Sequence, residues 1–128
     1  MPQESDKLPD DLARLILDHI ESVPHIEALM LIWENAPRTW SEVEISERIY
    51  RSLESTRKIL RDLQREGLVM GTSEARHGLT EDPARRDIAT RIVEVYRGNV
   101  YRVATLIHAR APQGMREFAK AFDLRGKT

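Results

Sequence analysis

Apolar and polar residues are spaced as two short amphipathic helices between Trp40 and Val69. Ser41 and Glu44 match a capping box, which predicts that the first helix begins at about residue 42. The apolar residues of this helix are Val43, Ile45 and Ile49. After a polar turn at Tyr50–Ser52, the second helix presents an apolar stripe formed by Thr56, Ile59, Leu60 and Leu63. Gly67 is placed where a helix ends in a left-handed residue.

The segments on either side predict further helices and a pair of short strands. Asp10 or Asp11 can cap a first helix, and Ser22 can cap a second helix rich in apolar residues. That second helix is expected to be the most buried element. Residues 68–70 and 78–80 are the strand candidates, and the polar segment GTSEARHGLT connects them.

A long helix is predicted from the cap residue Thr80 to about Arg110, with a weak point at Gly98. It carries a heptad seam of Ala89, Val93, Tyr96, Val100, Val103 and Ile107. The seam can pack inside one chain or pair with a second copy. Thirty helical residues span about 45 Å, which favours a homodimer. Phe118 and Phe122, in a short last helix, are expected to join that interface.

The order helix, helix, helix–turn–helix, strand, loop, long helix resembles bacterial winged helix-turn-helix regulators. The segments VPHIEALMLIWENAPRTW and SEVEISERIYRSLESTRKILRDLQREGLV carry the resemblance over residues 23–80. The flanking helices are placed like the dimerising helices of MarR-type regulators, and REFAKAFDLR is similar to a segment of small uncharacterised bacterial winged-helix proteins. The implied fold is mainly α, a winged helix-turn-helix with a small β-wing. An N-terminal arm and helix (1–22) and a C-terminal dimerisation region (81–128) would flank it.

The resemblance implies that Leu53–Glu66 is the recognition helix and Gly71–Gly78 the wing. The residues then expected to contact DNA from the helix are Glu54, Ser55, Lys58, Arg61 and Arg65. The residues expected to do so from the wing are Arg76 and His77. An ordinary solvated helix face and a polar loop tip are the alternative interpretations of the two sets.

The length of the chain and the distribution of its charges limit the functions that it can have. The chain has 128 residues, enough for one domain. Residues 1–37 hold 2 basic and 8 acidic side chains (−6), residues 38–80 hold 8 and 7 (+1), and residues 81–128 hold 10 and 6 (+4). A basic footprint over the whole chain is therefore absent, and any DNA-binding face must be local. No transmembrane run or signal peptide is recognised, so we expect a cytoplasmic protein.

Chemistry-bearing motifs are scarce. The chain has no cysteine, and its four histidines lack metal-ligand spacing, so neither a metal nor a cofactor is expected. No nucleophile elbow or phosphate-binding glycine loop is present, and we do not expect an enzyme. The leading hypothesis is a DNA-binding transcriptional regulator that reads the major groove as a homodimer. The alternative is a winged-helix module that binds a protein partner without binding DNA, which the acidic N-terminal third and the single wing arginine favour.

Overall fold

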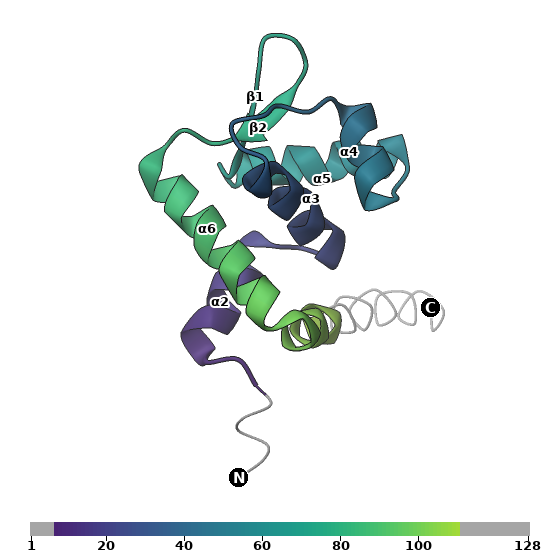
Figure 1. The fold of residues 1–128 in the computed structure, drawn as a ribbon. Helices are drawn as coiled ribbons and strands as arrows, with labels where there is room; N and C mark the ends of the chain where they lie inside the picture. The colour runs from purple at the N-terminus through teal and green to yellow at the C-terminus, as the bar shows by residue number, and fades with distance from the viewer. Residues whose placement is uncertain (1–6, 111–128) are drawn as a thin grey trace, which may run out of the picture.

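The structure, a computed structural model, describes residues 7–110. Its elements in chain order are helices α2 (Asp10–His19), α3 (Val23–Glu34), α4 (Glu42–Ile49) and α5 (Leu53–Arg65), strands β1 (Val69–Gly71) and β2 (His77–Leu79), and helix α6 (Pro83–Gly98). The chain is helical again over residues 100–110. In Figure 1, α3, α4, α5 and the hairpin form one group, and α6 runs from this group to α2. The predicted mainly α fold with a small β element is confirmed.

The helix–turn–helix begins where the capping box predicts. Ser41 Oγ accepts a hydrogen bond from the backbone N–H of Glu44 (3.1 Å), and the Glu44 carboxylate accepts one from the backbone N–H of Ser41 (2.8 Å). Tyr50 ends α4 in the left-handed conformation, with φ of 57°. Ser52 Oγ then accepts from the backbone N–H of Ser55 (3.0 Å) at the start of α5. Side-chain hydrogen bonds therefore fix the N-terminus of each of the two helices.

Helix α3 lies at the centre of the core, packed against α4, α5, α6 and β2. The side chains of Ile26, Leu29 and Ile32 have no exposed surface, as expected for the most buried element. Helix α5 buries its whole predicted stripe of Thr56, Ile59, Leu60 and Leu63 against this centre. Because that stripe faces inward, the opposite side of α5 is left to solvent.

The two strands form an antiparallel hairpin in which Val69 pairs with Leu79. Each strand is displaced by one residue from its predicted position, towards the C-terminus for β1 and towards the N-terminus for β2. Trp40 adds a bridge on the other edge of β2: its N–H donates to the carbonyl of His77 (2.8 Å), and the N–H of His77 donates to the carbonyl of Trp40 (2.7 Å). The hairpin is thereby fixed to the segment that enters α4.

Helix α6 corrects one prediction and confirms another. Asp82, rather than Thr80, caps the helix, since its Oδ2 accepts from the backbone N–H of Arg85 (2.9 Å). Thr80 is buried, and its hydroxyl accepts from the N–H of Asp82 instead (3.2 Å). The predicted weak point is real, because α6 ends at Gly98 and Asn99 interrupts the helix with φ of −146°.

The heptad seam lies mostly inside the single chain, which corrects its assignment to a dimer interface. The five seam residues at most 8% exposed are Ala89, Val93, Tyr96, Val103 and Ile107. Helix α6 packs on α3 and α2, so these side chains complete the core of their own chain. A side chain buried in its own chain has no surface left to offer a second copy. Only Val100, 51% exposed beside the helix break, keeps that possibility. Phe118 and Phe122 lie outside the described residues.

Candidate nucleic-acid interface

Helix α5 is the second helix of the helix–turn–helix, and it is held from behind by α3 and α4. Its solvent side carries every residue that the sequence nominated for this helix. The structure places on that exposed side Glu54, Ser55, Lys58, Arg61 and Arg65. A helix fixed along one face and charged along the other can enter the major groove of DNA.

Two of the three cations that the sequence nominated on this side of α5 are already paired with carboxylates. Lys58 Nζ lies 3.0 Å from Glu21 Oε2 and 2.7 Å from Asp62 Oδ2. Arg65 donates to the other carboxylate oxygen of Asp62. Arg61 has no hydrogen bond or ion pair with any residue between 7 and 110. The guanidinium of Arg61 is therefore the cation of this face most readily available to a phosphate.

The wing residues are positioned differently from the sequence prediction. Arg76 folds back onto the body of the domain, donating to Thr39 Oγ1 (3.0 Å), the Thr39 carbonyl (2.8 Å) and Glu44 Oε1 (2.9 Å). His77 is not at the loop tip: it lies in β2 and is 9% exposed. Burial lowers the pKa of His77, opposed by the nearby charge of Glu42. The projecting turn of residues 72–75 carries no cation of its own.

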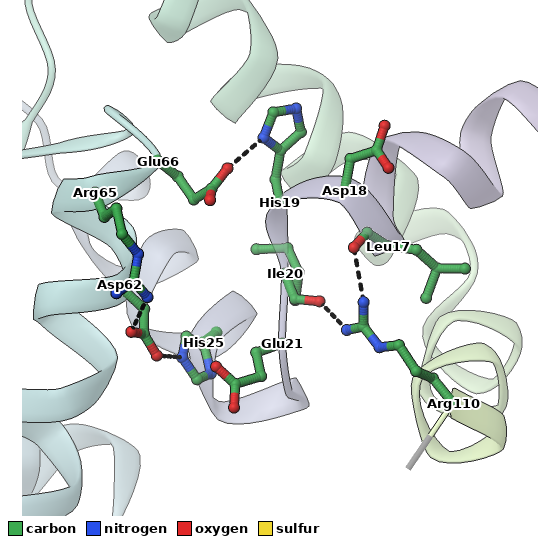
Figure 2. A pocket seen from close by; sticks show the side chains of 10 residues that line it. All are labelled: Leu17, Asp18, His19, Ile20, Glu21, His25, Asp62, Arg65, Glu66 and Arg110. Atoms are coloured by element: carbon green, nitrogen blue, oxygen red, sulfur yellow. Dashed lines mark hydrogen bonds and ion pairs between the residues drawn. The ribbon is translucent and has the colours of Figure 1, made fainter. Parts of the chain in front are cut away.

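Behind α5 lies a cluster of polar side chains that the sequence did not indicate. Ser22 Oγ lies 2.6 Å from His25 Nδ1, and His25 Nε2 lies 2.8 Å from Asp62 Oδ2. Beside them, His19 Nδ1 lies 2.8 Å from Glu66 Oε1. All of these groups except Ser22 line a pocket of about 130 Å³ between α5 and the link from α2 to α3 (Figure 2). The cluster thus joins the C-terminal half of α5 to the elements that precede the helix–turn–helix.

Charge compensation keeps the carboxylate of Asp62 ionised. Burial opposes the charge on Asp62, but hydrogen bonds from Lys58 and His25 outweigh it and hold the pKa of Asp62 far below its ordinary value. The hydrogen bonds to Asp62 and Glu21 raise the pKa of Lys58. The carboxylate of Asp62 is therefore charged throughout the neutral range. Since cations compensate this charge, we interpret the line from Ser22 through His25 to Asp62 as an anchor between α3 and α5.

A weak signal in the sequence was compatible with this cluster. Asp62 lies directly before Leu63 on the edge of the apolar stripe, where a charged side chain needs a partner to be buried. His25 lies in the first turn of the largely apolar helix α3, three residues after Ser22. Nothing in the sequence shows that His25 and Asp62 meet, because 37 residues separate them.

The chain also exposes an apolar surface away from α5. Val100 is 51% exposed and Tyr101 is 81% exposed, directly after the helix break. Tyr101 borders a groove of about 310 Å³ between the helical residues 100–110 and the start of α2. Leu8, Leu106 and Ala109 contribute to its walls. None of the helices described here is both long and apolar enough to cross a bilayer.

Comparison with known proteins agrees with this architecture. No protein-family model matches the chain, and no curated protein matches it. Among solved structures, the chain is similar to a MarR family protein of Mycobacterium tuberculosis, Rv2887, with 21% sequence identity and a TM-score of 0.54. The similarity covers 90% of this chain and 82% of that one. The fold is thus a winged helix-turn-helix, and its arrangement is that of a MarR-like protein.

Proposed function

We propose that this protein is a DNA-binding transcriptional regulator, rather than an enzyme, that uses α5 as its recognition helix. The observation that carries the proposal is the exposed polar stripe on α5. Arg61 lies at the centre of this stripe and forms no hydrogen bond or ion pair with residues 7–110. Support also comes from the architecture, which is similar to that of a solved MarR family protein. Double-stranded DNA is then the main partner.

The ion pairs on α5 predict an unequal contribution of its cations. Lys58 must leave the carboxylates of Glu21 and Asp62 before it can contact a phosphate. Arg61 has no such pairs to break among the described residues. We therefore expect Arg61→Ala to weaken DNA binding more than Lys58→Ala does.

The experiment is fluorescence anisotropy with random-sequence duplex DNA, measured from about 50 mM salt upwards. The double variant Lys58→Ala/Arg61→Ala should bind more weakly at low salt. Each lost phosphate contact reduces the slope of log affinity against log salt by about 1. Arg14→Ala/Arg91→Ala is the matched control, because it removes the same charge from exposed positions outside the helix–turn–helix. Equal losses in the two double variants would refute recognition by α5.

The homodimer is the second part of this proposal. The five buried seam residues cannot supply its interface, but Val100, Tyr101 and the adjoining groove leave an apolar surface on the described part of the chain. Two copies joined there would present two recognition helices. Helix–turn–helix dimers read half-sites about 34 Å apart, so this spacing between the paired α5 helices is what the proposal requires.

A protein-interaction module without DNA binding is the second candidate function. The observation that favours it is the wing, whose only arginine is bound to Thr39 and Glu44 and whose turn carries Glu74. The ion pair of Arg57 with Glu42 (3.0 Å) removes one more cation from the front of the motif. Absence of DNA binding at about 50 mM salt would favour this candidate over the regulator.

A further inference from the structure

Three side chains from separate elements bring metal-ligating atoms to one point beside α5 (Figure 2). Glu21 belongs to the link between α2 and α3, His25 to α3 and Asp62 to α5. Each offers one ligand atom, and the three atoms lie within 4.8 Å of one another. One imidazole and two carboxylates form a donor set that suits zinc and similar divalent transition metals.

The imidazole is held as it would be in a metal site. The His25 side chain is 5% exposed, and the Ser22 hydroxyl lies 2.6 Å from its Nδ1. The Nε2–H now donates to Asp62. When a metal ion replaces that proton, the Ser22 oxygen can accept the Nδ1 proton and the Nε2 lone pair is directed at the ion. Metal-bound histidines usually have such a partner on the second nitrogen, because it fixes both tautomer and ring orientation.

A cation already occupies the space between the carboxylates. The ammonium of Lys58 contacts Glu21 Oε2 at 3.0 Å and Asp62 Oδ2 at 2.7 Å. The site therefore favours positive charge, and a divalent ion would compete with the lysine for it.

We propose that Glu21, His25 and Asp62 bind a divalent transition-metal ion of the zinc class, and that this ion displaces the ammonium of Lys58. Tetrahedral ligands about 2.0 Å from zinc lie about 3.3 Å from one another. His25 Nε2 and Asp62 Oδ2 are now 2.8 Å apart, so a movement of a few tenths of an ångström would admit the ion. Glu21 is exposed and can adjust to complete the third bond, with water as the fourth ligand.

Displacement of Lys58 links this site to the outer face of α5. The freed ammonium can contact a phosphate, so metal should strengthen DNA binding and steepen its salt dependence. This consequence rests on the proposed function, whereas the metal site itself does not. Linkage is reciprocal, so DNA should strengthen metal binding by the same factor.

The first test measures metal binding in the absence of DNA. Chelator-treated full-length protein is titrated with Zn²⁺ against a chromogenic indicator, and with Co²⁺ to record the visible absorption of the bound ion. We expect saturation at one ion per chain, with at least a tenfold loss of affinity in Glu21→Gln. The exposed position of Glu21 makes this variant safe for folding. Lys58→Met should instead raise the affinity, since it removes the competing cation.

Asp18→Asn is the matched control, because Asp18 lines the same pocket but does not belong to the ligand cluster. Absence of one-to-one binding by the wild type would overturn the proposal. Equal weakening by Glu21→Gln and Asp18→Asn would also overturn it, since that result indicates general attraction to surface acids. Metal binding without DNA binding would leave this site standing and reject the regulator. DNA binding in the presence of chelator, without any metal binding, would support the regulator and reject the metal site.

Discussion

Replacing Asp62 with alanine tests whether the buried polar cluster holds α5 in place. The substitution removes the acceptor of three groups: His25 at 2.8 Å, Lys58 at 2.7 Å and Arg65. It deletes little apolar contact, because the methyl group of alanine occupies the position of the aspartate Cβ. The expected loss of stability is therefore a loss of polar interactions rather than of hydrophobic packing.

The three interactions contribute unequally. The side chain of His25 is 5% exposed, so its Nε2 would be left without an acceptor inside the protein, at a cost of about 1–3 kcal/mol. The side chains of Lys58 and Arg65 are 53% and 69% exposed, so each of their ion pairs contributes about 0–1 kcal/mol. We expect Asp62→Ala to lower the free energy of unfolding by about 3 kcal/mol.

Urea unfolding, followed by circular dichroism and tryptophan fluorescence, measures this loss if the slope m is unchanged. Asp18→Ala is the control, expected to change the free energy by no more than about 0.5 kcal/mol. Because folding lowers the pKa of Asp62, its contribution is complete above the unfolded pKa and lost as pH falls. The difference between wild type and Asp62→Ala should therefore shrink below about pH 4. A loss under about 1 kcal/mol at pH 7 would refute the anchoring role.

Two further predictions concern the helix break and the surface beside it. Gly98→Ala should raise the free energy of unfolding by up to about 1 kcal/mol, because a Cβ there meets no atom within 4 Å and alanine restricts the unfolded chain. Gly67→Ala should lower it, since Gly67 has φ of +76°, and thermal unfolding of both variants checks the opposite signs. Tyr101→Glu should lower the fraction of dimer in analytical ultracentrifugation, whereas Tyr50→Glu, at a position 90% exposed on the helix–turn–helix, should not. Equal dimer fractions in the two tyrosine variants would place the interface elsewhere.

Local signals predicted the helix–turn–helix well. The Ser41 and Glu44 capping box and the apolar spacing of α5 act over a few residues, so the sequence shows them directly. The cap of α6 was misplaced by two residues because Thr80 and Asp82 are both capable of capping. Burial of Thr80 and the hydrogen bond from Arg85 to Asp82 decide between them.

Patterns of apolar residues do not show what they pack against. The spacing from Ala89 to Ile107 predicted a helix with one apolar side, which is correct. The same spacing serves an internal helix and a helix that pairs with a second copy, because both need a continuous apolar stripe. The contact with α3 decides the matter, and it depends on the fold of the whole chain.

The charges on α5 show why composition alone describes an interface poorly. The sequence places three cations on one side of this helix, yet two of them share the carboxylate of Asp62. That carboxylate is held in turn by His25, in an element 37 residues away. Any ligand that competes for Asp62 would therefore change the charge that α5 presents to solvent. A recognition helix built in this way couples its outer face to the pocket behind it, and Arg61 provides the part of that face which does not depend on the coupling.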